Sequence, residues 1–368
     1  MIWHRFKLMA RYAGVLLVVA CGLAWLLLPA AQAPAALPAD KSVIDIHVHV
    51  AGLGNGCAGC FVGDALLSSY KFGWYLRAFG TSEAEITDRG DAVIVERILE
   101  MVAESRWVSQ VVILALDGVV NNTGLLDRER TQVYVANSYV ARLAREHEEI
   151  LFGASINPHH VDALARLDQA VADGAVLVKW IPAIMDIDPA DPALDAFYAR
   201  LAQHQLPLLV HVGDENAFAH ADNTLGDPWR LRRPLEAGVK VIAAHIGTTG
   251  TNDGTPNFDR LLPMFDEFPN LYSEISSLTQ VNKLGYLVRA AGRSGLRGRL
   301  LHGSDWPLQF FPLVWAGWHT GRAPLAELRY AAGLNNPLDR DIALKSALGM
   351  PPSVFTFAGS FLQVATKR

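Results

Sequence analysis

The segment Val43-Ile44-Asp45-Ile46-His47-Val48-His49-Val50 is almost continuously apolar and ends in two histidines. Apolar runs without polar alternation are typical of strands covered on both faces, as in a parallel sheet. Each apolar run is followed by a polar or Gly-rich loop and then by a stretch with helical spacing. Seven further apolar runs follow the first: 110–116, 151–156, 175–181, 206–211, 239–245, 271–275 and 299–303. Eight such units predict an α/β fold of the (β/α)8 TIM barrel type. An open doubly wound sheet is the alternative, but no Gly-x-Gly-x-x-Gly motif follows a strand.

The composition permits a large packed core. Of 368 residues, 51% are apolar and 19% are charged, which is below the roughly 25% charge of an average soluble domain. The net charge of −5, without a Lys/Arg block in the body of the chain, argues against a nucleic-acid partner. The 3 cysteines show neither usual zinc-site spacing. Any metal is therefore expected to be held mainly by histidine and carboxylate.

The N-terminal region, 1–33, differs from the rest of the chain. Arg5, Lys7 and Arg11 form a basic head, and residues 12–28 are uncharged and mostly apolar. Such a run is long enough for a short transmembrane helix, since about 17 to 25 residues cross a bilayer. We therefore expect a membrane anchor, followed by a Pro/Ala linker over 34–40 and a catalytic domain over 41–368.

Two other interpretations of this region stay open. A basic head followed by an apolar run is also the pattern of a secretory signal, and Ala31 and Ala33 offer a cleavage site before Pro34. Lipidation at Cys21 is a third interpretation. Because positive charge stays on the cytoplasmic side, all three place the body of the protein outside the cytoplasm, on the periplasmic side if the source is bacterial.

The connection from the first strand to the second is unusually long. A lid insertion is expected at about 51–90, because long loops at the carboxyl end of barrel strands cover the pocket. Cys57 and Cys60 lie within it. In an oxidising compartment they could form a disulfide, and the alternative is two free thiols near the pocket.

Metal-capable side chains stand at the predicted strand ends. His47 and His49 share one face of the first strand, because residues i and i+2 of a strand point the same way. Four further strands end on, or run into, such groups: Lys179, His211, His245 and Asp305. Imidazole and carboxylate ligands suit Zn²⁺ or a related divalent ion. The convergence of five strand ends predicts a metal centre at the mouth of the barrel.

Four motifs carry a resemblance to a known family: Asp-Ile-His-Val-His at 45–49, Val-His-Val-Gly at 210–213, Ala-Ala-His-Ile-Gly at 243–247 and Gly-Ser-Asp-Trp-Pro at 303–307. Over about residues 43–350 the chain resembles the amidohydrolase superfamily, in its amidohydrolase-related branch. The resemblance implies that His47, His49 and His211 ligate metal. It also implies that Asp305 is both ligand and general base, and that His245 ligates a second ion or polarises the substrate.

Lys179 leaves the number of ions open. The resemblance to binuclear members implies that this lysine is carboxylated on its ε-nitrogen and bridges two metal ions. The branch also includes mononuclear members. For that reason we expect one ion. An unmodified Lys179 would orient an anionic substrate or line the barrel wall. Asp45 is expected either to support the ligands through hydrogen bonds or to act directly.

Other residues are candidates for substrate contacts. Glu274, at the end of the seventh strand, is expected to be a polar contact in the pocket. An aromatic wall is expected from several residues, which suggests a ring-containing small molecule as substrate: Trp180, Trp306, Phe310, Phe311, Trp315 and Trp318.

The predicted reaction is metal-dependent hydrolysis of an ester, lactone or amide. The alternative is a metal-dependent nonoxidative decarboxylase of an aromatic or unsaturated acid, which the same branch contains on the same ligands. A noncatalytic membrane-tethered binding domain is a third hypothesis. Decarboxylases normally hold the substrate carboxylate with an arginine, and no arginine stands at a strand end, since the nearest candidates are Arg77 and Arg89 in the lid. Hydrolysis is therefore preferred.

Overall fold

The computed structural model describes residues 29–364. The predicted membrane segment at 12–28 and the lipidation candidate Cys21 lie outside these residues. Within 29–364, none of the helices has both the length and the apolar character needed to cross a bilayer.

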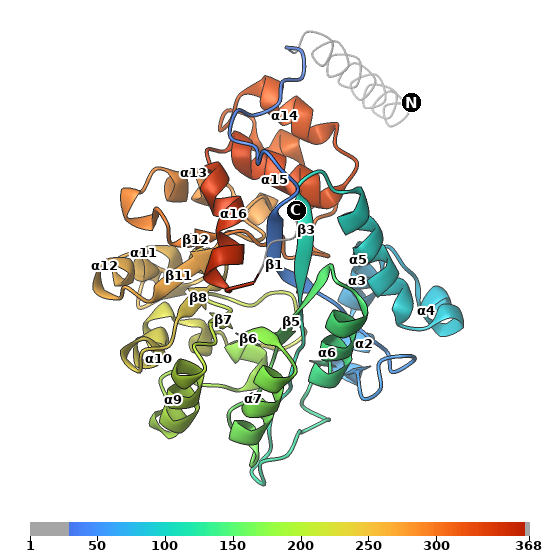
Figure 1. The fold of residues 1–368 in the computed structure, drawn as a ribbon, viewed down its shortest axis with the longest axis vertical. Helices are drawn as coiled ribbons and strands as arrows, with labels where there is room; N and C mark the ends of the chain where they lie inside the picture. Colours follow the sequence, from blue (N-terminus) through green and yellow to red (C-terminus); the bar gives the residue numbers. More distant parts are fainter. Residues whose placement is uncertain (1–28, 365–368) are drawn as a thin grey trace, which may run out of the picture.

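Eight parallel strands form the central sheet, in the spatial order β1-β3-β5-β6-β7-β8-β11-β12. Their bounds are β1 Val43–His49, β3 Val108–Leu114, β5 Ile150–Ala154, β6 Ala175–Trp180, β7 Leu208–Val210, β8 Val241–Ala243, β11 Leu271–Glu274 and β12 Leu300–Leu301. The last strand returns to the first, because Ile46 N donates to His302 O at 3.1 Å and Val48 bridges Trp306 in parallel. The predicted α/β TIM barrel is confirmed (Figure 1).

Alternating strand residues build two cores. Inward-facing side chains such as Ile44, Leu177 and Leu209 form a cluster inside the barrel. Their neighbours Val43, Val178 and Val210 belong to the outer core, which packs against the helices. Helix α16 (Pro352–Phe361) closes the amino-terminal end of the barrel, where its Phe361 ring stacks edge-on against Tyr272 at 4.6 Å between centroids. Only the carboxyl-terminal end is therefore left for a site.

The outer layer consists of helices that alternate with the strands (Figure 1). Most of the longer ones bury one face, as the apolar periodicity of the sequence predicts. The exception is α15 (Pro337–Ala347), which is buried almost all round. The helices of this layer, long and short, are α5 Ala92–Glu104, α6 Asn137–Glu146, α7 Ala163–Ala172, α9 Asp195–Gln203, α10 Arg232–Glu236, α11 Asn257–Leu261, α12 Met264–Glu267, α13 Tyr286–Ala291, α14 Leu325–Ala332 and α15 Pro337–Ala347.

The connection between β1 and α5 carries small elements of its own. They are β2 Phe61–Val62, α2 Asp64–Leu67, α3 Tyr70–Ala78 and α4 Glu83–Arg89, and we call residues 51–90 the lid. The Asp91 carboxylate orders the start of the lid by accepting the backbone N–H groups of Leu53, Gly54 and Cys57 at 2.7 to 3.2 Å. Cys57 and Cys60 form a disulfide in this turn.

Helix α3 is fastened across the barrel mouth to the loop that follows β7. Tyr75 donates its hydroxyl to Ala217 O at 2.6 Å, and Lys71 Nζ donates to Asn216 O at 2.8 Å and to Phe218 O at 2.6 Å. Because three hydrogen bonds join α3 to a loop from the other side of the mouth, the lid covers the carboxyl-terminal end of the barrel.

Candidate metal centre

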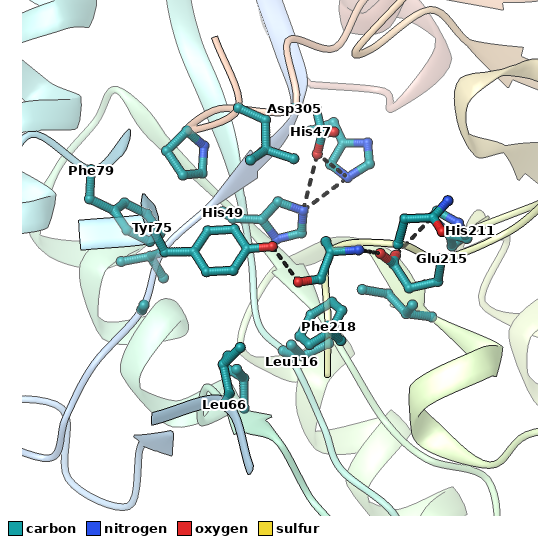
Figure 2. Close-up of a pocket in the computed structure, with 18 of the residues that line it drawn as sticks. His47, His49, Leu66, Tyr75, Phe79, Leu116, His211, Glu215, Phe218 and Asp305 are labelled. Atoms are coloured by element: carbon teal, nitrogen blue, oxygen red, sulfur yellow. Dashed lines mark hydrogen bonds and ion pairs between the residues drawn. The ribbon is translucent and has the colours of Figure 1, made fainter. Parts of the chain in front are cut away.

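Side chains from the first strand and from the loop after the last strand meet at the mouth of the barrel (Figure 2). The Nε2 atoms of His47 and His49 lie 3.2 Å apart. Oδ1 of Asp305 lies 3.5 Å from His47 Nε2 and 3.4 Å from His49 Nε2. His245 joins this group, since His47, His245 and Asp305 each offer a ligand atom within 4.8 Å of the others.

Unusual backbone conformations turn two of these side chains toward the mouth. His245 in the 3₁₀ turn η4 (Ala244–Gly247) has φ of 57°, and Asp305 has φ of 62°. Left-handed conformations of non-glycine residues cost of order 1–3 kcal/mol and concentrate at functional sites. The backbone of Asp305 is anchored by its N–H, which donates to His47 O at 2.9 Å. Strain at these two residues is therefore maintained by the surrounding barrel.

Hydrogen bonds behind the histidines determine which ring nitrogen faces the mouth. His47 Nδ1 donates to the Glu274 carboxylate at 3.2 Å, and His245 Nδ1 donates to Ser276 O at 3.2 Å. A ring whose Nδ1 carries the proton presents the lone pair of Nε2, which is the usual arrangement of a metal-ligating histidine.

His211 follows the same pattern. Its Nδ1 lies 3.4 Å from Glu215 Oε2, while its buried Nε2 has no hydrogen-bond partner among the described residues. A buried polar atom without a partner is costly, so this nitrogen calls for a ligand. The residues present therefore fit a divalent cation held by imidazole Nε2 atoms and by Asp305.

The protonation states also suit a cation. Burial lowers the pKa of His47, His211 and His245, which keeps the imidazoles neutral. Burial alone would raise the pKa of Asp305, but its histidine neighbours and the charge of Lys283 outweigh that effect and hold the pKa below its usual value. The group thus combines neutral nitrogen donors with one ionised carboxylate.

Lys179 lies inside this group. It projects from β6 and is almost fully buried, with Nζ 3.2 Å from His47 Nε2. Burial lowers its pKa to about 8, against the opposing effect of three carboxylates, those of Glu274, Asp305 and Glu215. The lysine singled out from the sequence is therefore within reach of the same ion as His47.

The centre opens into a cavity of about 310 Å³ under the lid. His47, His49, His211, His245, Asp305 and Lys179 all line it. Its aromatic side chains come from the lid and from the loop after β7: Phe72, Tyr75, Phe79 and Phe218. Figure 2 labels the last three. Aliphatic residues of the lid, including Leu66 and Leu76, extend this apolar wall.

The structure places the predicted substrate contacts outside the cavity lining. Trp180 lies on the outer face of β6, packs against Phe197 and Tyr198 and donates its indole N–H to Ile156 O at 2.7 Å. The alternation of strand residues explains this, because Lys179 points inward and its neighbour must point outward. Trp306 is buried against Phe79 beside the cavity and does not line it.

Glu274 is also displaced from its predicted role, since its fully buried carboxylate is used behind His47 and His245 and does not line the cavity. The aromatic residues after β12 do not form the wall either: Phe310, Phe311, Trp315 and Trp318 are absent from the lining, and Phe311 is 71% exposed. Nor do Arg77 and Arg89 line the cavity, and Arg89 pairs with Glu85 and Glu96.

Two residues of the site, Glu215 and Lys283, were not predicted from the sequence. Glu215 lies beside His211, four residues along the chain, which is a signal that could have been used. Lys283 lines the cavity from the turn η5 (Val281–Lys283), and no local pattern in the sequence marks it. The apolar face of α3 was detectable, because Phe72, Tyr75, Leu76 and Phe79 have the i, i+3, i+4, i+7 spacing of one helix face.

The family model described as amidohydrolase matches residues 44–338, and the chain belongs to this family. The family and the His/His/Asp group support an enzyme that uses a divalent metal. A search of curated proteins finds no match.

Comparison with solved structures finds several similar chains, and the first of them has the same fold. An uncharacterized TIM-barrel protein from Bordetella bronchiseptica matches with a TM-score of 0.54 and 18% identity, over 87% of this chain and 98% of that one. A putative 2-pyrone-4,6-dicarboxylic acid hydrolase from Pseudomonas putida has a TM-score of 0.46 and 15% identity, over 88% and 98%. A 2,6-dihydroxybenzoate decarboxylase from Rhizobium has a TM-score of 0.45 and 14% identity, over 88% and 99%.

Proposed function

We propose that this protein is a metal-dependent hydrolase that cleaves an ester, lactone or amide bond in a small, ring-containing molecule, with zinc as the ion. The observation that carries the proposal is the position of the Asp305 carboxylate, whose Oδ1 lies 3.4 Å from His49 Nε2 and 3.5 Å from His47 Nε2. Its lowered pKa favours the ionised form. A carboxylate at this place can accept a proton from water held beside it.

The residues divide the work as follows. His47, His49 and His211 would hold the ion, with Asp305 as a fourth contact. His245 and Lys179 lie beside His47 and would help to hold a second ion if one is bound. The ion, when bound, supplies a Lewis acid that acidifies water and polarises a carbonyl. Asp305 accepts the proton of the attacking water at its carboxylate oxygen. The lid, tied down by Tyr75 and Lys71, excludes bulk water from the cavity.

Hydrolysis is preferred over decarboxylation because no arginine of the described residues lines the cavity. The test is a panel of lactones, aryl esters and aromatic carboxylates assayed with zinc-loaded protein, with acid release and carbon dioxide followed separately. Hydrolysis of at least one lactone or ester supports the proposal. Carbon dioxide from an aromatic acid, with no ester or lactone cleaved, would establish the decarboxylase instead.

Variants of the ligands sharpen the test. His47→Ala and His49→Ala should lose zinc and activity together, whereas Asp305→Asn should keep much of the zinc and lose turnover. Near-normal turnover of Asp305→Asn on a proven substrate would refute its assignment as the proton acceptor. Retention of a full complement of zinc by both histidine variants would refute the ligand assignment.

For localisation we propose a membrane-anchored protein with its barrel outside the cytoplasm. The support is in the sequence alone: the basic head is followed by the uncharged run at 12–28. Secretion after cleavage is the alternative, and the two differ in whether the N-terminus of the mature protein lies before or after residue 33.

A further inference from the structure

Lys283 is a buried cation that faces the cavity and that the proposed reaction does not use. It stands in η5 after β11 and is 7% exposed. Within residues 29–364 its Nζ has one hydrogen-bond partner, the hydroxyl of Ser277, and it forms no ion pair. An ammonium group carries three donors, and burying one with two donors unused is costly. The position therefore calls for an anionic or strongly polar acceptor from outside the chain.

Contacts place Lys283 next to the metal centre. Its Nζ donates to the hydroxyl of Ser277, and that hydroxyl lies 3.1 Å from His245 Nδ1. Lys283, His245 and Asp305 line the same cavity. The ammonium group therefore lies beside the reacting centre and not at the outer rim of the cavity.

The lid side of the cavity is apolar, in contrast to the charged side at Lys283. The lid side is formed by Leu53, Leu66, Phe72, Leu76 and Phe79. The other lysine in the lining, Lys179, already lies 3.2 Å from His47 Nε2. A second anionic group placed under the lid would lose its hydration without finding a cation there. Asp214 and Glu215, which also line the cavity, would repel it.

We propose that Lys283 binds a carboxylate oxygen of the substrate, and that this substrate is a monocarboxylate whose remaining part is apolar and lies under the lid. The proposal rests on the proposed function, because it names the substrate class of the same cavity. In a lactone or ester of this class the carboxylate is a bystander, which Lys283 holds while a different carbonyl reacts.

The test is ligand binding, which does not depend on turnover. Zinc-loaded full-length protein is titrated by calorimetry with 4-phenylbutyrate, with the neutral 4-phenylbutyramide and with the dicarboxylate pimelate. Wild-type protein should prefer phenylbutyrate to the amide by about tenfold or more, since hydrogen bonds between charged groups are the strong ones. Pimelate should bind more weakly than phenylbutyrate, because its second carboxylate would lie against the apolar wall.

Variants separate the contribution of Lys283 to carboxylate binding from that of the zinc ion, which also attracts carboxylates. Lys283→Gln can keep the hydrogen bond to Ser277 but lacks the charge, and we expect the preference for phenylbutyrate over the amide to fall about tenfold. Lys283→Arg should retain much of that preference. The control is Lys240→Gln, whose lysine lies over the Phe361 ring at the closed end of the barrel, and it should match wild type. Zinc content and thermal midpoint, measured for each protein, show that the centre and fold are intact.

An unchanged preference in folded, zinc-loaded Lys283→Gln would overturn the role of Lys283. Tighter binding of pimelate than of phenylbutyrate, or no binding of either phenyl probe to wild type, would overturn the substrate class. Failure of the proposed function has a different signature, in which no ester or lactone is hydrolysed although the charge-dependent preference for phenylbutyrate is present.

Discussion

Glu274→Gln tests whether the carboxylate behind the histidines sets the affinity for metal. Oε1 of Glu274 accepts from His47 Nδ1 at 3.2 Å, from His245 N at 2.9 Å and from Ser276 Oγ at 2.9 Å. Oε2 accepts from the N–H of Ser276 at 2.5 Å. A glutamine has the same shape, but one of its two positions must carry an NH₂ group.

Either orientation of that amide breaks the arrangement. If the NH₂ group replaces Oε1, it opposes the N–H groups of His47 and His245, and if it replaces Oε2, it opposes the N–H of Ser276. A lost hydrogen bond to a charged group costs about 1.5–3 kcal/mol. Loss of such a supporting partner typically weakens metal binding about 10–100-fold, which corresponds to about 1.4–2.7 kcal/mol. The two ranges agree, so we expect zinc affinity to fall by one to two orders of magnitude.

The assay is competition for zinc against a chromophoric chelator of known affinity. Glu267→Gln is the matched control, because Glu267 pairs with Arg232 on the surface, and its zinc affinity should equal that of wild type. A Glu274→Gln protein that is folded and binds zinc within about twofold of wild type would refute the reasoning. Glu274 would then be a packing residue with no influence on the ligands.

Three further predictions concern the lid, the core and the membrane. Tyr75→Phe removes the hydrogen bond to Ala217 O at 2.6 Å, which contributes about 0.5–1.5 kcal/mol. KM on a proven substrate should therefore rise roughly 2–10-fold, with kcat little changed. An unaltered KM would mean that this bond does not hold the lid closed. Burial raises the pKa of Asp45 to about 7. Between pH of about 4 and pH of about 7, the native state therefore keeps a proton that the unfolded state has released. The free energy of unfolding falls as the pH rises through this range. Chemical unfolding of metal-free protein should therefore show wild type losing up to about 4 kcal/mol relative to Asp45→Asn from pH 4 to 7, whereas parallel curves would contradict the shift. Full-length protein should sediment with membranes and a chain beginning at Lys41 should remain in solution; soluble full-length protein with its N-terminus at Pro34 or later would establish cleavage instead.

Much of the barrel was accessible from sequence because its rules are local. Strands buried on both faces must be apolar, and a strand side chain alternates direction, so the spacing of His47 and His49 is enough to place both on one face. The same rule places Lys179 inward and Trp180 outward. Trp180 was predicted as a substrate contact without this rule, and the structure places it away from the cavity.

The lid shows where local rules stop. The sequence indicates a long insertion, and the spacing of Phe72, Tyr75, Leu76 and Phe79 indicates an apolar face on α3. Which surface that face covers depends on the hydrogen bonds from Lys71 and Tyr75 to a loop more than 140 residues further along the chain. The aromatic residues after β12 were therefore no guide to the aromatic wall.

By itself the sequence determined the order of the strands, the barrel and the ligand types at the strand ends, because hydrophobic patterning and the alternation of strand side chains act through neighbouring residues. Only the tertiary structure decided that Glu274 supports two histidines, that the lid and not the last loop provides the aromatic wall, and that Lys283 faces the cavity. Each of these depends on the closure of the barrel and on side chains from distant segments meeting at one point, where burial and charge act through space and leave no pattern along the chain.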